Sequence, residues 1–272
     1  MSPLRLHASL PMYDLPELRA ATDALWAGFA RAFRAEGLQD VPETLTRGGD
    51  VMALWTAPDL FFSQTCGYPL THALAGQVTL VATPVYDLPD CAPGHYRSEI
   101  LVRAGDPAAR LADLRGRRAA ANGSDSQSGY SALRHAVRDL AEDGRFFGSV
   151  AFTGSHRAAM QAVARGEADV CAVDIVTYRL LQRVDAELTG ALRVLAGSAE
   201  APALPYIARR GLAAEDLQRL RAGLARAVGD PALVEVRQAL LLAGVVVLPL
   251  SAYDRIGEME SAARAAGYPE LA

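Results

Sequence analysis

Segments typical of β-strands and of α-helices alternate along most of the chain, and this alternation constrains the fold more than any other feature. Short apolar or alternating runs predict strands over residues 4–10, 59–65, 77–86, 98–103, 117–122 and 168–174. Segments between these runs have the apolar spacing of helices. Because such alternation is typical of helices packed on parallel strands, we predict the α/β fold class, with mixed, mostly parallel sheets flanked by helices.

Local signals mark the ends of three predicted helices. Asp14 and Glu17 have the spacing of a capping box at the start of a helix that extends to residue 37. Ser155 and Asp174 each precede a further helix at the position of an N-cap, where a side-chain oxygen accepts a free backbone N–H.

Two passages that contain Pro and Gly interrupt the alternation, at 87–96 and 196–206. We interpret them as two crossings of the chain between two lobes, since a chain of 272 residues is long enough to build both. The first lobe is then discontinuous, with residues 1–94 and 202–272, and the second lobe comprises residues 95–201.

Composition excludes several kinds of chemistry. The net charge is −4 and all 27 Lys or Arg residues are Arg, so we expect no nucleic-acid partner, no lysine Schiff base and no Walker-type phosphate loop. The three cysteines, Cys66, Cys91 and Cys171, are too few for a disulfide framework. Neither they nor the five scattered histidines have metal-ligand spacing, so we expect no metal and no cofactor.

Membrane insertion is not expected either. The longest apolar run, at 239–250, is too short to span a bilayer. The first residues lack a charged n-region followed by an apolar h-region, so we expect no export signal within this sequence.

A cluster of small hydroxyl residues lies between a predicted strand and a predicted helix, in ANGSDSQSGYSALRHAV at 121–137. A loop after a strand of an α/β sheet faces the ligand crevice, and a helix N-terminus offers free N–H groups and partial positive charge. Ser126 and Ser128 add hydroxyl donors, Gln127 adds an amide, and Gly129 permits close approach of the backbone. The loop suits a small oxyanion, and a plain polar helix cap is the alternative. The glycine patterns of dinucleotide sites and nucleophile elbows are absent.

Three segments in order carry a family resemblance: DLRGRRAAANGSDSQSGYSALR, GSHRAAMQAVARGEADVCAVD and APALPYIARRGL. With DLFFSQTCGYPL they resemble periplasmic substrate-binding proteins of phosphate/phosphonate-type ABC transporters, over most of the chain. The resemblance implies a two-lobed type II periplasmic-binding fold with a ligand cleft between the lobes. It also implies capture of a small oxyanion, such as phosphonate or phosphate, by closure of the lobes and delivery to an ABC permease in the membrane.

The resemblance also implies ligand-binding residues. Ser126, Gln127, Ser128 and the N–H of Gly129 resemble the family's anion-holding loop, and His156 could donate to the same anion. Family members often have Thr where this chain has Gln127, which leaves the identity of the ligand open.

Four more residues complete the predicted site. Asp174 resembles a carboxylate that receives the amino group of a ligand, and its role as an N-cap is compatible with that. From the first lobe, Tyr13, Gln64 and Tyr68 follow strands and could line the crevice, while a place in the core is the alternative for each.

Two other functions stay open on the same fold. One is a cytoplasmic enzyme that acts on an aromatic carboxylate, as in the futalosine pathway, with His156 or Asp174 as general base. The other is a ligand-sensing domain, which would need a fused output module. Transport implies a periplasmic protein whose leader has been removed; the enzyme implies the cytoplasm.

Overall fold

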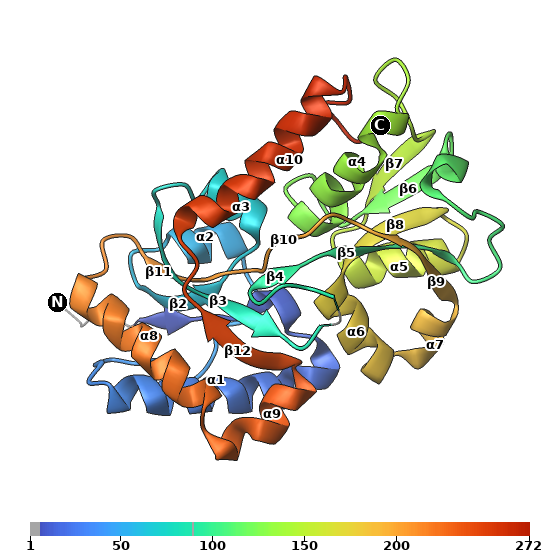
Figure 1. Ribbon diagram of the computed structural model, residues 1–272. Coiled ribbons are helices and arrows are strands. Elements are labelled where there is room, and N and C mark those ends of the chain that lie inside the picture. Colours follow the sequence, from blue (N-terminus) through green and yellow to red (C-terminus); the bar gives the residue numbers. More distant parts are fainter. Residues whose placement is uncertain (1–5, 89) are drawn as a thin grey trace. The chain divides into compact units, whose positions relative to one another are not determined.

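The computed structural model describes residues 6–88 and 90–272, and the chain divides into two compact units (Figure 1). The first unit comprises Met1–Gly94 and Pro202–Ala252, and the second comprises His95–Ala201 and Tyr253–Ala272. Residues 4 and 5 of the predicted first strand, and residue 89 of the first crossing passage, lie outside the described residues.

The first unit contains a five-stranded sheet in the order β1-β2-β11-β3-β12. Its strands are β1 (His7–Ala8), β2 (Leu60–Gln64), β3 (Val78–Tyr86), β11 (Tyr206–Arg209) and β12 (Leu242–Val246). Its helices are α1 (Arg19–Ala35), α2 (Val51–Thr56), α3 (Gly67–Thr71), α8 (Ala214–Val228) and α9 (Val234–Ala239), with short 3-10 turns η1 (Pro11–Tyr13), η2 (Pro16–Leu18), η6 (Pro231–Leu233) and η7 (Leu250–Tyr253), the last of which reaches into the second unit.

An aromatic cluster forms the core of the first unit. Helix α1 packs with α8 and α9 over the sheet (Figure 1). The rings of Phe29 and Phe33 lie 6.3 and 5.4 Å from that of Phe62 in β2, which lies 5.0 Å from the ring of Tyr206 in β11. Burial of each such ring contributes about 1.5–3 kcal/mol. The apolar face of α1 therefore lies against the sheet.

The second unit contains a five-stranded sheet in the order β7-β6-β8-β5-β9. Its strands are β5 (Ser98–Arg103), β6 (Arg118–Ala121), β7 (Ser149–Phe152), β8 (Val170–Asp174) and β9 (Leu192–Gly197). Its helices are α4 (Ala132–Val137), α5 (His156–Ala164), α6 (Ile175–Val184), α7 (Ala186–Gly190) and α10 (Asp254–Ala265), with a π-helical turn η4 (Gln127–Ser131) and 3-10 turns η3 (Leu111–Leu114) and η5 (Arg138–Leu140). Two short strands, β4 (His95–Tyr96) and β10 (Ala201–Pro202), pair where the chain crosses between the units.

The expectation of mostly parallel sheets is wrong. Among the described strands, β1–β2, β6–β7 and β6–β8 are parallel, whereas β2–β11, β3–β11, β3–β12, β5–β8 and β5–β9 are antiparallel. The crossings explain the antiparallel pairs β3–β11 and β5–β9. The chain leaves the first unit after β3 and re-enters through β11, and it enters the second unit through β5 and leaves after β9. Neighbouring exit and entry strands therefore run in opposite directions.

The C-terminal segment 253–272 belongs to the second unit, whereas the sequence pattern predicted it in the first lobe. The backbone N–H groups of Phe146 and Phe147 both donate to the carbonyl of Ala272, and the N–H of Leu271 donates to the Tyr130 hydroxyl. These bonds join residues far apart in the sequence, so no local pattern could have indicated them.

Two of the three predicted helix starts are confirmed. The Ser155 hydroxyl accepts the N–H of Ala158 at 3.1 Å, and Asp174 caps α6. The predicted capping box at Asp14 is wrong, because α1 begins only at Arg19 and the Asp14 carboxylate accepts a hydrogen bond from Arg47 at 2.6 Å instead. Within 6–88 and 90–272, no helix is both long and apolar enough to cross a membrane.

Candidate ligand-binding site

The serine loop, residues 126–129, follows strand β6 in the second unit. The Ser126 hydroxyl accepts the backbone N–H of Gly129 at 3.0 Å and so caps the helical turn that begins at Gln127. All four residues are buried. The polar-cap interpretation of Ser126 is therefore confirmed. The turn is π-helical, a form that is frequent at functional sites.

Position 129 requires glycine because the side chain of Asn122 lies too close to leave room for a Cβ. A Cβ there would lie 1.8 Å from Oδ1 of Asn122, which directly follows β6. This Oδ1 is buried and has no hydrogen-bond partner among the described residues. The start of the helix is thus held tightly against the end of the strand.

His156 joins the serine loop from the start of α5. Its Nε2 lies 2.9 Å from the Ser128 hydroxyl. Burial lowers the pKa of His156 to about 4, although the carbonyl of Ala172 partly offsets this. The imidazole is therefore neutral at neutral pH, and the cluster of Ser126, Ser128 and His156 offers hydrogen bonds without a formal positive charge.

Gln127 faces a different neighbour. Its Nε2 lies 3.4 Å from Sδ of Met259 in α10, and its Oε1 is buried with no hydrogen-bond partner in the described part of the chain. The sequence predicted an amide donor to an anion here. In the structure the amide contacts a thioether, a weak acceptor, and the ligand role of Gln127 stays a prediction.

Asp174 ends strand β8 and is buried. Its Oδ1 accepts the backbone N–H groups of Val176 and Thr177 at 2.7 and 3.2 Å. The cap interpretation is confirmed, and the ligand role of this carboxylate stays a prediction.

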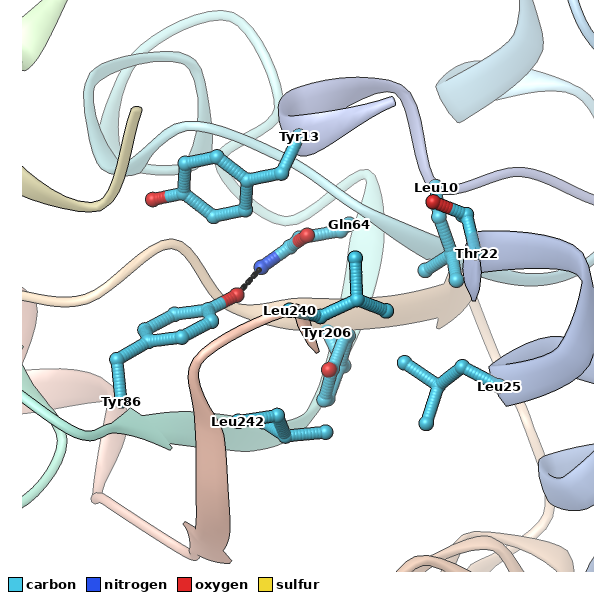
Figure 2. Close-up of a pocket in the computed structure, with 9 residues that line it drawn as sticks. All are labelled: Leu10, Tyr13, Thr22, Leu25, Gln64, Tyr86, Tyr206, Leu240 and Leu242. Carbon is cyan, nitrogen blue, oxygen red and sulfur yellow. Dashed lines mark hydrogen bonds between the residues drawn. The ribbon is translucent and has the colours of Figure 1, made fainter. Parts of the chain in front are cut away.

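Tyr13 and Gln64 meet in a small pocket of the first unit (Figure 2). The ring of Tyr13 lies edge-on to Tyr86 at 5.3 Å, and Gln64 Nε2 donates to the Tyr86 hydroxyl and to the carbonyl of Leu204 at 3.0 and 2.9 Å. The pocket is lined by Leu10, Tyr13, Thr22, Leu25, Gln64, Tyr86, Tyr206, Leu240 and Leu242, none of which carries a charge.

The structure does not bring all the predicted site residues together. Tyr68 lies in α3, where its ring stacks on His72 at 3.8 Å, and it does not line this pocket. Conversely, Tyr86 and Tyr206 line the pocket but were not predicted. Their only sequence signal is a tyrosine at the end or start of a strand. No group of three or more potential metal ligands exists among the described residues.

Comparison with known proteins gives one family match. Residues 57–253 match the sequence profile of a family described as the periplasmic substrate-binding protein of phosphonate ABC transporters. No curated protein sequence matches the chain.

Solved structures show the same fold. A binding-protein component of an ABC phosphonate transporter from Pseudomonas aeruginosa has a TM-score of 0.77 at 16% identity, over 96% of this chain and 87% of that one. PhnD1 from Prochlorococcus marinus, in complex with methylphosphonate, has a TM-score of 0.77 at 14% identity, over 95% and 98%. A Xanthomonas citri protein bound to ATP has a TM-score of 0.71 at 16% identity, over 97% and 98%. The predicted fold class, a periplasmic-binding-protein fold with sheets flanked by helices, is confirmed.

Proposed function

Because this chain belongs to the family of phosphonate-binding periplasmic substrate-binding proteins of ABC transporters, we propose that it captures a small phosphonate in the periplasm by closure of its two lobes and delivers it to its permease. Members of the family are transport components that pass a small molecule to a membrane permease. The identity of the ligand, the residues that hold it and the location of this chain are our proposal.

One observation carries the assignment of the anionic group: the serine loop and His156 form one cluster at the start of a helical segment. A helix N-terminus favours an anion through its free N–H groups and its partial positive charge. The Ser126 and Ser128 hydroxyls and the neutral imidazole add short-range donors. The phosphonate oxygens are proposed to bind there.

Such hydrogen bonds can supply the differential affinity that a ligand needs in order to close a two-lobed receptor. A shift from a mostly open to a mostly closed population needs about 5.5 kcal/mol of differential affinity. Hydrogen bonds to a charged group contribute about 1.5–3 kcal/mol each. Two to four of them would supply the shift without a Lys or Arg in the loop.

The test is a double variant, Ser126→Ala with Ser128→Ala, titrated with methylphosphonate by calorimetry. We expect at least tenfold weaker binding, which corresponds to about 1.4 kcal/mol. Sulfate and an aromatic carboxylate serve as competing probes for the wild-type protein.

The matched control is Asp230→Ala, which removes another N-cap, since the Asp230 carboxylate accepts the N–H of Ala232 in the first unit. It should cost about 1 kcal/mol of stability and leave the affinity unchanged. Unchanged affinity in the double serine variant would refute the proposed anion loop, and a preference for the aromatic carboxylate would refute a phosphonate receptor.

A further inference from the structure

A second cavity of the first unit lies where strand β1 ends. Its lining comes from the residues that follow β1, from the first residue of α1, and from α2 with the loop that leads into it. Every lining residue lies within 9–54, so the cavity belongs to the first unit alone. Its volume of about 190 Å³ leaves room for roughly ten heavy atoms.

A buried chain of three side chains leads to this cavity. The indole N–H of Trp55 donates to the Ser63 hydroxyl at 3.1 Å, and the Ser63 oxygen lies 2.7 Å from that of Ser9, which lines the cavity. All three residues are at most 3% exposed. The other acceptor near the Ser63 hydroxyl is the carbonyl of Gln64, at 3.5 Å. The chain is therefore best satisfied when Ser63 donates to Ser9 and Ser9 donates to an acceptor in the cavity.

Four charged side chains at the cavity leave one cation weakly paired. Arg47 is held by two carboxylates: its Nε and Nη2 donate to Asp14 at 2.6 and 3.1 Å, and its Nη1 lies 2.8 Å from Asp23. Arg19 lies 3.8 Å from the same Asp14 oxygen that binds Arg47 Nε, beyond hydrogen-bond distance. The four charges sum to zero. Arg19 is thus the cation that can bind an anion in the cavity.

Much of the remaining lining is apolar. Leu10, Leu45, Val51 and Leu54 contribute aliphatic side chains, and Thr46 adds a hydroxyl. A small inorganic anion would leave this apolar surface against water, whereas the hydrocarbon part of an organic anion would cover it. The cavity therefore suits a ligand with one charged end and one apolar end.

The charges and donors decide which charged end fits. A carboxylate carries the single negative charge that Arg19 can pair, and its two oxygens can accept the Ser9 proton and guanidinium N–H groups at once. A doubly charged anion would bring a second charge close to the Asp14 carboxylate with no further cation to pair it. An ammonium group would compete with two guanidinium groups for Asp14, and it offers no acceptor to Ser9.

We propose that this cavity is a second binding site, specific for a short aliphatic monocarboxylate. Ser9 and Arg19 bind the carboxylate, and the aliphatic side chains of the lining contact its hydrocarbon part. The site goes beyond the proposed function and does not depend on it, because its residues and those of the serine loop belong to different units.

The experiment titrates the whole protein with pentanoate, pentylamine, 1-pentanol and sulfate by calorimetry. We expect pentanoate to bind at least tenfold more tightly than the other three compounds. Arg19→Gln and Ser9→Ala should each weaken pentanoate binding at least tenfold, because each removes a hydrogen bond to a charged group. Arg31→Gln is the matched control: Arg31 is exposed on the same helix and does not line the cavity, so this variant should keep the affinity within twofold.

The variant Ser126→Ala with Ser128→Ala separates this site from the serine loop, and it should bind pentanoate as tightly as the wild type. Loss of pentanoate binding in that variant would place pentanoate at the serine loop and overturn the inference. Unchanged affinity in Arg19→Gln, or tighter binding of sulfate than of pentanoate, would also overturn it. If methylphosphonate binds and pentanoate does not, the second site is refuted and the proposed function stands. If pentanoate binds and no phosphonate does, the proposed function alone is refuted.

Discussion

Lowering the pH from about 6.5 to about 4 should reduce the free energy of unfolding by up to about 3 kcal/mol through His156. Burial lowers the pKa of His156 from its usual value of 6.5 to about 4 in the folded state. Between these values the unfolded chain binds a proton that the folded chain does not, so stability falls as the pH falls. Urea titrations at a series of pH values measure the effect.

The His156→Gln variant isolates this contribution, because glutamine does not titrate. Between pH 6.5 and pH 4, the free energy of unfolding of this variant should fall by up to about 3 kcal/mol less than that of the wild type. His135 also has its pKa lowered to about 4, again chiefly by burial, but it is more exposed to solvent. His135→Gln should therefore remove a smaller part of the dependence. Parallel pH profiles for the wild type and His156→Gln would contradict the prediction.

Gly129→Ala should destabilise the second unit and damage the serine loop. The added Cβ would lie 1.8 Å from Oδ1 of Asn122 and 3.3 Å from Cε1 of His156, so both side chains must move. We expect a loss of about 1–3 kcal/mol in the free energy of unfolding, as for other overpacked sites. Methylphosphonate should bind at least tenfold more weakly. Denaturant unfolding and calorimetry measure the two effects.

Gly257→Ala is the matched control. Gly257 lies within α10 in the same unit, and a Cβ there would have no neighbour within 4 Å. Alanine favours a helix over glycine by about 1 kcal/mol, so this variant should be more stable than the wild type. Two glycine-to-alanine changes in one unit should thus have opposite signs. A stable Gly129→Ala protein with unchanged affinity would show that Asn122 can move at little cost.

Local signals in the sequence predicted most elements of the fold, but they could not predict the relative direction of paired strands. The N-cap of Ser155 depends on bonds within three residues, and such bonds leave a pattern in the sequence. The pairing of β3 with β11 joins segments more than a hundred residues apart, and nothing in either strand specifies its partner's direction. The same is true of the segment 253–272, whose bonds reach Tyr130 and Phe146.

In the candidate site, too, features set by neighbouring residues could be predicted, and features set by residues far apart in the sequence could not. The serine loop is contiguous, so its polar cap could be read from the residues themselves. The contact of Gln127 with Met259 depends on the position of a helix 132 residues away along the chain. The pocket around Tyr206 exists only because β11 lies beside β2 in the first sheet, so neither Tyr206 nor its pairing with Gln64 could be predicted.

The divided course of the chain also sets the order in which the protein can fold during synthesis. Strand β11 is the central strand of the first sheet, and β12 ends only at Val246. The second unit is incomplete until residues 253–272 have been synthesised. Since domains generally fold as units, the first core can close only after Val246, and the second only after residues 253–272, have emerged from the ribosome. A nascent chain that stays unfolded this long remains available to chaperones and to any machinery that transports unfolded polypeptides.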